Sequence, residues 1–429
     1  MSVNGTSLPG SHNIRRVVLE NGITVLAFEN YAAQSVVIAG TIRAGALYET
    51  HSHSGLASIT AGSLMRGTQN RDFDSIHSSL EDIGADLDIG AGIHGTSFNG
   101  KALAEDLPVL IDLLADILRY PAFPTAQVER LRGEILTGLQ YRQHDTRYRA
   151  NRAFRENLYP DNHPYHYSTR GTLESIPEIQ ISDLGKFHQQ YFGPQGMILV
   201  VVGAVSAAEA VNIARMRLGD WQNPGQPPQP VLPPVPNVEE IRRFSTNVSG
   251  KSQSDIVLGV AGPPRNADDY RAATLANSIL GQFGMMGRIG DEVREKRGLA
   301  YYAYSSVEGG HGPGSWSVSA GVNPANVNQA IDAIAGEVRR ITSEPVTDEE
   351  LSDNKSYFTG HLPLQLESNE GIAGSLMNIA TYDLELDHLL TLRDKINALT
   401  REDLLAAAQH YWNPDAFVVS VAGPEIGDE

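Results

Sequence analysis

The feature that most constrains the fold is a proline-rich stretch near the middle of the chain. Residues 223–236 read NPGQPPQPVLPPVP, and seven of these fourteen residues are proline. Proline fixes φ and has no amide hydrogen, so we expect an extended, semi-rigid segment here. One hydrophobic core rarely serves more than about 250–300 residues, and the chain has 429. We therefore predict two lobes, residues 1–222 and 239–429, joined by a linker at 223–238.

The two halves contain similar segments in the same order. Residues 110–118 (LIDLLADIL) and 330–338 (AIDAIAGEV) both carry apolar residues at helical spacing, which predicts an amphipathic helix in each half. In each half a proline and a threonine follow shortly afterwards and introduce a second helical segment. The offset between the halves is about 220 residues, which indicates an internal duplication.

Strand-like segments accompany these helices. Residues 17–27 (VVLENGITVLA) alternate around Asn21-Gly22, a strong signal for a β-hairpin. Short apolar or β-branched runs at 35–43, 197–204 and 255–260 predict further strands. The mixture of strands and helices predicts an α+β protein with two tandem similar lobes, each a mainly antiparallel sheet with helices packed on it.

Composition limits the partners. The net charge of −18 disfavours nucleic acid and anionic membrane surfaces but is compatible with basic peptides. The absence of cysteine excludes disulfides, a thiol nucleophile and thiolate zinc sites, and it favours a reducing compartment. The first residues lack a signal-peptide core, and no apolar run approaches the roughly 18 residues of a membrane span. We therefore expect a cytoplasmic protein with no membrane partner.

The first half carries a recognisable motif. Residues 40–68 contain GTIRAGALYE followed by SGLASITAGSLMRGT. This text resembles the pitrilysin/insulinase family of zinc peptidases, especially the small two-lobed branch that includes mitochondrial processing peptidase. The family's helix reads roughly G-L-A-H-F-L-E-H-M-x-x-x-G-T, and the matching residues here are Gly55, Leu56, Ala57, Gly67 and Thr68.

The resemblance implies a zinc site whose residues are replaced. In the family, H-x-x-E-H places two histidines on one helical face to bind zinc, and the glutamate between them serves as general base. The corresponding residues here are Ser58, Ala61 and Gly62, and the third ligand, a glutamate on a later helix, corresponds to Gly138. None of these side chains can bind zinc or accept a proton at neutral pH. We therefore expect no metal in this chain and no catalysis by the chain alone.

Other candidate metal ligands have more ordinary explanations. His51 and His53 (THSHS) could chelate, but such pairs in polar loops are more often simply solvated. His163 and His166 (HPYHY) resemble a structural segment of the family. Glu129 and Glu134, near the third-ligand helix, cannot form a zinc site without histidines. We therefore do not predict a relocated metal site.

The second half keeps another family motif. Residues 279–306 read ILGQFGMMGRIGDEVREKRGLAYYAYSS, which is similar to the family pattern L-G-x-G-x-x-S-R-L-x-x-x-V-R-E-x-x-G-L-A-Y-x-V-x-S. The resemblance implies that Arg294 and Tyr301 hold substrate, with the arginine fork and the tyrosine hydroxyl donating to peptide carbonyls. Without it, Arg294 would be interpreted as a surface salt-bridge residue. The glycines between Gly281 and Gly290 suggest an extended loop that substrate or a partner could approach closely.

These observations lead to one functional hypothesis and two alternatives. The family branch includes two-subunit peptidases in which one chain carries H-x-x-E-H and its partner carries the arginine–tyrosine pair. The resemblance therefore implies a non-catalytic subunit of a heterodimeric zinc metalloendopeptidase, with the zinc in a homologous partner subunit and extended peptide as substrate. The alternatives are a structural core or scaffold subunit and a peptide-binding homodimer, neither with a role in proteolysis.

Overall fold

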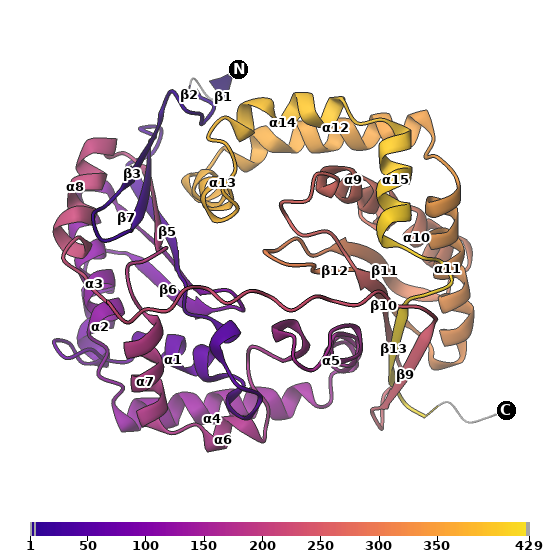
Figure 1. Cartoon of the computed structure of the whole chain (residues 1–429), viewed down its shortest axis with the longest axis horizontal. Helices are drawn as coiled ribbons and strands as arrows, with labels where there is room; N and C mark the ends of the chain where they lie inside the picture. Colours follow the sequence, from indigo (N-terminus) through magenta and orange to yellow (C-terminus); the bar gives the residue numbers. More distant parts are fainter. Residues whose placement is uncertain (1, 4–5, 426–429) are drawn as a thin grey trace. The chain divides into compact units, whose positions relative to one another are not determined.

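The computed structural model describes residues 2–3 and 6–425 (Figure 1). The chain forms two units, each assembled from three stretches of sequence. Unit 1 comprises Met1–Thr137, Ser168–Val231 and His361–Leu392. Unit 2 comprises Gly138–Tyr167, Leu232–Gly360 and Arg393–Glu429. Each unit thus takes most of its residues from one half of the chain and the rest from the other half.

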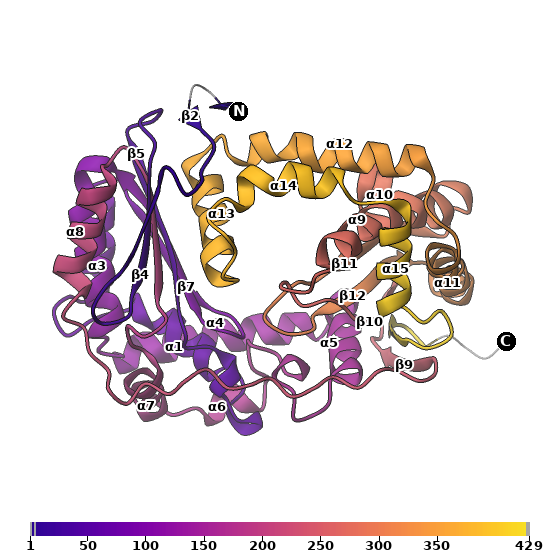
Figure 2. The same ribbon diagram turned by 45° about the horizontal axis from the view of Figure 1, so that its top comes forward.

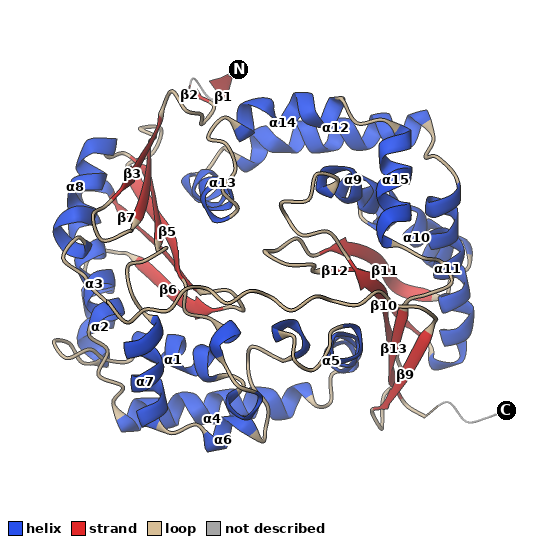
Figure 3. Cartoon of the chain, in the orientation of Figure 1, coloured by secondary structure: helices blue, strands red, loops and turns tan. Residues whose placement is uncertain are grey.

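The sheet of unit 1 has the order β3-β4-β8-β5-β7-β6, and its strands are drawn in red in Figure 3. Its strands are β3 (Ile14–Val18), β4 (Thr24–Glu29), β5 (Ser35–Ile42), β6 (Asp86–Ala91), β7 (Thr96–Leu103) and β8 (Ile198–Gly203). Strands β4 and β8 are parallel and the other neighbouring pairs are antiparallel. The predicted hairpin around Asn21-Gly22 is confirmed, since β3 pairs with β4 and Gly22 has a φ of 93°.

The sheet of unit 2 has the order β11-β12-β10-β13-β9. Its strands are β9 (Arg242–Asn247), β10 (Ser254–Ala261), β11 (Ala300–Val307), β12 (Ser315–Val322) and β13 (Val418–Gly423). Here β13 and β9 are parallel and the other neighbouring pairs are antiparallel. A two-stranded ribbon, β1 (Ser2–Val3) with β2 (Thr6–Ser7), lies near the start of the chain.

The two sheets share one topology. The order β4-β8-β5-β7-β6 in unit 1 corresponds to β9-β13-β10-β12-β11 in unit 2, and in each sheet the parallel pair comes first. Strand β5 begins at Ser35 and β10 at Ser254, an offset of 219 residues. The structure thus confirms the predicted α+β class with two similar lobes.

Helices pack on the sheet of each unit (Figure 1). Unit 1 contains α1 (Leu56–Leu64), α2 (Phe73–Glu81), α3 (Leu107–Arg119), α6 (Ser175–Glu178), α7 (Ile181–Tyr191), α8 (Ala207–Leu218) and α13 (Asn369–Thr381). Unit 2 contains α5 (Thr146–Leu158), α9 (Tyr270–Gly281), α10 (Phe283–Ile289), α11 (Val327–Ser343), α15 (Arg401–Tyr411) and a π-helical segment, η5 (Gly290–Lys296).

Three further helices include the residues where the chain passes from one unit to the other: α4 (Thr125–Arg142), α12 (Asp348–Gln365) and α14 (His388–Asn397). The short 3₁₀ helices are Ala46–Tyr48, His51–His53, Ala104–Asp106, Pro164–His166 and Pro324–Asn326. The two predicted amphipathic helices are confirmed as α3 and α11. No helix in the described part of the chain combines the length and apolar character needed to cross a membrane.

Each half of the chain contributes one helix to the other half's sheet. Helix α5 packs on β10 and β13, and α13 packs on β5 and β8 (Figures 1 and 2). Polar side chains fix both helices at their first residues. Thr146 Oγ1 donates to Asp255 of β10, and Asn369 Nδ2 donates to the carbonyl of Ser35 in β5 at 3.2 Å. Since Thr146 and Asn369 each begin their helix and are 223 residues apart, the exchange follows the duplication.

The core of unit 2 lies between its sheet and α9, α11 and α15. All eight residues of β12 are buried, and Trp316, Val318 and Ala320 are fully inaccessible. A strand covered on both faces is expected to be buried along its whole length. This packing makes β12 the fixed centre on which the edge strand β11 is held.

Candidate functional site

Helix α1 is formed with the features that the family motif predicts. Its first turn is capped by Glu49, whose carboxylate accepts hydrogen bonds from the amides of Gly55 at 2.9 Å and Ala57 at 2.6 Å. Gly55 has a φ of 95°, and a Cβ at this position would lie 2.8 Å from Cα of Gly171. Glycine is therefore required there by both conformation and space.

The three replaced positions share one face of α1. Ser58, Ala61 and Gly62 stand at i, i+3 and i+4, which places them on the same side of the helix. Ala61 is fully buried, whereas Ser58 and Gly62 are half-buried. A Cβ on Gly62 would lie 3.1 Å from Cδ2 of Leu131 in α4. The helix thus keeps its place while its side chains offer no zinc ligand.

The position of the third ligand lies in open surroundings. Gly138 is in α4, and no heavy atom lies within 4 Å of the point where its Cβ would be. The carboxylates earlier in α4 are paired with arginines. Glu134 contacts Arg66 at 2.7 Å, and Glu129 contacts Arg132 at 3.0 Å.

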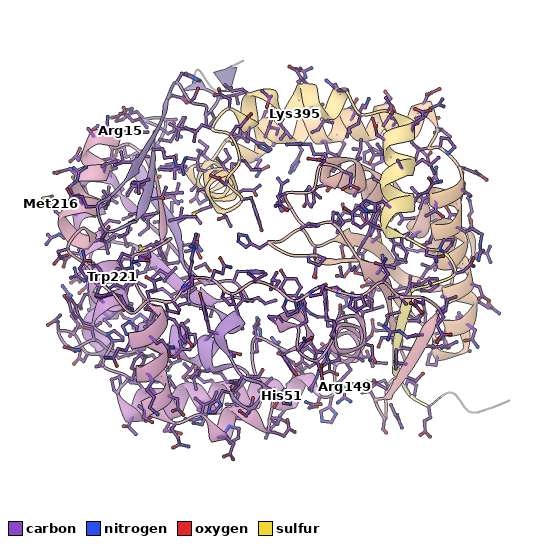
Figure 4. All side chains as sticks on the ribbon, viewed as in Figure 1. Arg15, His51, Arg149, Met216, Trp221 and Lys395 are labelled. Carbon is purple, nitrogen blue, oxygen red and sulfur yellow. The ribbon has the colours of Figure 1, made fainter. Side chains whose placement is uncertain are left out.

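The first histidine pair is engaged in a local polar turn. His51 and His53 form the 3₁₀ helix before α1 (His51 is labelled in Figure 4). His53 Nδ1 lies 3.2 Å from Thr50 Oγ1 and 3.0 Å from Ser52 Oγ. These contacts explain the THSHS sequence by local hydrogen bonding.

The second histidine pair is structural. His163 is fully buried, its ring stacks on Tyr159, and its Nδ1 accepts from the amide of Tyr165 at 3.1 Å. Burial lowers the pKa of His163, which favours the neutral ring. His166 Nδ1 lies 2.9 Å from the carbonyl oxygen of Tyr159. Both rings serve to organise this segment of unit 2.

The residues present do not fit a zinc ion. Within residues 2–3 and 6–425, no group of three or more His, Cys, Asp or Glu side chains is placed to hold a metal. A zinc site needs three or four nitrogen, sulfur or oxygen ligands around one point. We therefore derive no chemical step through zinc bound to this chain.

Arg294 and Tyr301 lie at the junction between η5 and β11 in unit 2. Segment η5 ends at Lys296 and the chain turns at Gly298, which has a φ of 60° and whose amide donates to the carbonyl of Arg294 at 3.0 Å. The Arg294 side chain is 35% exposed, and its Nε lies 3.5 Å from Glu295 Oε1. That single, solvent-exposed ion pair holds the guanidinium only weakly. Within residues 2–3 and 6–425 the guanidinium makes no hydrogen bond, so its other donors can bind a ligand.

A β-bulge sets the direction of Tyr301. In the pairing of β11 with β12, Ala300 lies opposite Val322 and Tyr302 lies opposite Gly321, so Tyr301 is an extra residue. In a regular strand Tyr301 would alternate onto the face of the buried Ala303, which packs against helices. Instead, Tyr301 is 82% exposed. The bulge therefore directs this side chain toward solvent, a common use of bulges beside functional sites.

The prediction of an extended loop between Gly281 and Gly290 is wrong. The segment is helical, as the end of α9 followed by α10. Its glycines serve close packing instead. A Cβ on Gly281 would overlap the backbone of Ser305 in β11, and one on Gly287, where φ is 62°, would lie 2.5 Å from the carbonyl of Ile279. Glycine there allows the helices to approach β11 and each other.

A buried network next to Tyr301 was not predicted. The hydroxyl of Tyr302 donates to Asp255 and accepts from Arg147 Nε at 3.0 Å. Asp255 is 2% exposed. Burial, together with the bond to Asp255, raises the pKa of Tyr302. The sequence feature that could have indicated this network is the aspartate at the start of an apolar strand, because a buried carboxylate needs hydrogen-bond donors.

The comparisons with known proteins agree with this architecture. Residues 24–168 match the family model described as insulinase, peptidase family M16, and residues 178–358 match the model of the peptidase M16 inactive domain. An uncharacterized zinc protease of Streptomyces coelicolor is 25% identical over 416 residues, which cover 94% of this chain and 89% of that protein. The mitochondrial-processing peptidase subunit beta of Bos taurus is 23% identical over 428 residues, which cover 96% and 84%.

Solved structures show the same fold. The crystal structure of a peptidase M16 inactive domain from Pseudomonas fluorescens has a TM-score of 0.86 and 26% identity, and the match covers 97% of this chain and 99% of that one. The duplicated sheets and the helix with the motif's glycines define a two-lobed protein of the insulinase type. The chain belongs to peptidase family M16, which confirms the resemblance to the pitrilysin/insulinase peptidases.

Proposed function

We propose that this chain is a non-catalytic subunit of a heterodimeric zinc metalloendopeptidase, in which a homologous partner subunit binds the zinc. The observation that carries the proposal is a contrast within one fold. Helix α1 keeps its cap and its required glycine, yet Ser58, Ala61 and Gly62 occupy the zinc-binding face. At the same time, Arg294 and Tyr301 keep the substrate-holding motif.

The proposed role of Arg294 and Tyr301 is to hold extended peptide. The guanidinium can donate to peptide carbonyls, and the tyrosine hydroxyl can donate to another. Both side chains have accessible surface, and the bulge frees Tyr301 from packing. Binding a peptide in an extended form would position its scissile bond for the partner's metal, which lowers the entropic part of the barrier.

The relatives support a peptidase context. One is named as a zinc protease, and another is named as a subunit of a processing peptidase. A subunit whose own metal site is degenerate is consistent with an assembly in which another chain supplies the metal.

The test is co-expression with an H-x-x-E-H-bearing homologue encoded in the same genome. We expect the two chains to co-purify, and we expect cleavage of a fluorogenic peptide only by the mixture. A homologue that works alone at the full rate would contradict the proposal and favour a scaffold role. A stable homodimer that binds peptide but no homologue would favour the peptide-binding alternative.

A further inference from the structure

Helix α5 concentrates positive charge in a strongly acidic protein. This helix contains four arginines, Arg147, Arg149, Arg152 and Arg155, and one carboxylate, Glu156, although the whole chain has a net charge of −18. Arg147 and Arg149 stand in the first turn of α5. Cations are unfavourable there because the helix N-terminus carries a partial positive charge. The helix dipole therefore does not explain this placement.

The guanidinium of Arg147 is fixed in position. Its Cζ lies 4.0 Å above the centre of the Tyr302 ring, and its Nε donates to the Tyr302 hydroxyl at 3.0 Å. The Tyr302 hydroxyl in turn donates to the buried Asp255. Stacking and hydrogen bonding together hold an arginine that is otherwise exposed.

The structure requires glycine at one position for this arrangement. Tyr302 of β11 and Asp255 of β10 both pair with Gly321 of the intervening strand β12. A Cβ on Gly321 would overlap the Tyr302 ring. The phenol therefore crosses β12 above Gly321 to reach the carboxylate.

The remaining donors of Arg147 point to no protein acceptor. Among the described residues, Nη1 and Nη2 make no hydrogen bond or ion pair. Since Nε already binds Tyr302, the free pair forms a fork that matches the two oxygens of a carboxylate. Arg149 differs in this respect, because its Nη1 donates to Gln143.

We infer that Arg147 is a carboxylate-binding subsite for peptide, held in position by the Tyr302–Asp255 pair. The inference rests on the proposed function and adds to it a substrate class, namely peptides with a carboxylate that Arg147 can bind. In this arrangement Arg147 contacts the ligand, and Tyr302 and Asp255 are positioning residues. The carboxylate can come from an Asp or Glu side chain or from the peptide's C-terminus.

The test measures binding of fluorescein-labelled peptides to the purified full chain by fluorescence anisotropy. A peptide with one internal Glu, its Gln counterpart and the C-terminal amides of both are compared at low salt. We expect the Glu peptide or the free C-terminus to bind about three- to tenfold more tightly, as suits an exposed but preorganised ion pair. Loss of affinity with Gln identifies a side-chain carboxylate, and loss with the amide identifies the C-terminus.

Variants separate this subsite from the rest of the chain. Arg147→Gln should remove the preference for the carboxylate, Arg147→Lys should keep part of it, and Tyr302→Phe should weaken it by releasing the guanidinium. Arg149→Gln is the matched control in the same helical turn and should keep the preference. A cooperative melting transition well above the assay temperature shows that each variant is folded, with a lower midpoint expected for Tyr302→Phe.

The experiment distinguishes failure of the Arg147 subsite from failure of the proposed function. If Arg294→Ala weakens all peptides equally while neither carboxylate matters, the proposed function stands and the Arg147 subsite is refuted. If no peptide binds at any concentration tested, both the peptide-holding role and the subsite are refuted. A carboxylate preference that survives Arg147→Gln also overturns the inference.

Discussion

The hydroxyl of Tyr302 donates a hydrogen bond to the carboxylate of Asp255 across an intervening strand. Asp255 also accepts from Thr146, the first residue of α5. One buried carboxylate therefore joins the edge strand that carries Tyr301 to the helix that carries Arg147. The contact that fixes α5 on the sheet formed by the other half of the chain therefore also fixes the residue next to Tyr301.

Tyr302→Phe should destabilise the chain by about 1–3 kcal/mol, because it removes one donor from a buried carboxylate and leaves the ring in place. The measurement is urea denaturation at pH 7. The alkaline side provides a second check. The pKa of Tyr302 is raised in the folded state, so its contribution is complete below pH 10, the ordinary tyrosine value, and is lost as pH rises further. The variant should therefore lose less stability than the wild type above pH 10; an identical decline would contradict the assignment.

Glu49 should make the fold less stable as pH rises from about 5 to 9. Burial raises the pKa of this carboxyl to about 8, although the amides of Ala57 and Gly55 oppose the shift. Because the folded pKa lies above the ordinary value of 4.5, the stabilising contribution is complete below that value and is lost as pH rises through 8. Glu49→Gln should flatten this part of the stability profile, measured by thermal melting at each pH. A wild-type profile that rises over the same range would show that Glu49 is ionised in the fold.

The purified chain should contain no stoichiometric zinc. The positions of α1 that we match to the family's zinc motif hold Ser58, Ala61 and Gly62, and none carries a ligand atom suited to zinc. Elemental analysis after mild chelation measures this directly. About one zinc retained per chain would mean that ligands elsewhere had been overlooked.

Restoring the motif should be limited by the packing around α1. Ala61→Glu places a carboxylate in a fully buried site and should destabilise the chain by about 1–3 kcal/mol or more. Gly138→Glu faces open space in α4 and should be neutral or stabilising by up to about 1 kcal/mol, because glycine is a poor helix former.

The variant that combines Ser58→His, Ala61→Glu, Gly62→His and Gly138→Glu should not cleave peptide efficiently. Gly62 lies close to Leu131, so a histidine there would be crowded. We also expect the new histidines to lack the hydrogen-bond partners that orient zinc ligands. Thermal melting tests the predicted changes in stability, and turnover of a fluorogenic peptide tests the predicted lack of cleavage. Turnover at the rate of an H-x-x-E-H homologue would show that the surroundings had not changed.

Local sequence signals predicted the elements that depend on local chemistry. Asn21-Gly22 specified a hairpin because glycine accepts the positive φ at its turn, and apolar spacing specified α3 and α11. The replaced positions of α1 could be found because the flanking glycines preserve the register. These features depend on residues close in sequence.

Long-range features could not be predicted in this way. Thr146 and Asp255 are 109 residues apart, and no local pattern indicates that α5 covers a sheet built from the other half of the chain. The glycines of 281–290 suggested an extended loop because glycine permits both extended backbone and close packing. Only the position of Ser305 against Gly281 decides between them.

The substrate-holding role is tested by Arg294→Ala and Tyr301→Phe in the mixed complex. Arg294→Ala removes charge-assisted hydrogen bonds worth about 1.5–3 kcal/mol, so kcat/KM should fall roughly ten- to a hundredfold if those bonds persist in the transition state. Tyr301→Phe should lower kcat/KM with little effect on stability, since the side chain is 82% exposed and loses only its hydroxyl.

Arg297→Ala is the control, because Arg297 is already bound to Glu292, with its Nε and Nη2 at 2.8 and 2.7 Å from one carboxylate oxygen. Its loss should leave kcat/KM nearly unchanged. If Arg297→Ala alone impaired cleavage, the substrate pair would lie at other positions. If all three variants kept full activity while the complex remained intact, this subunit would not contact substrate, and its role would be that of a scaffold.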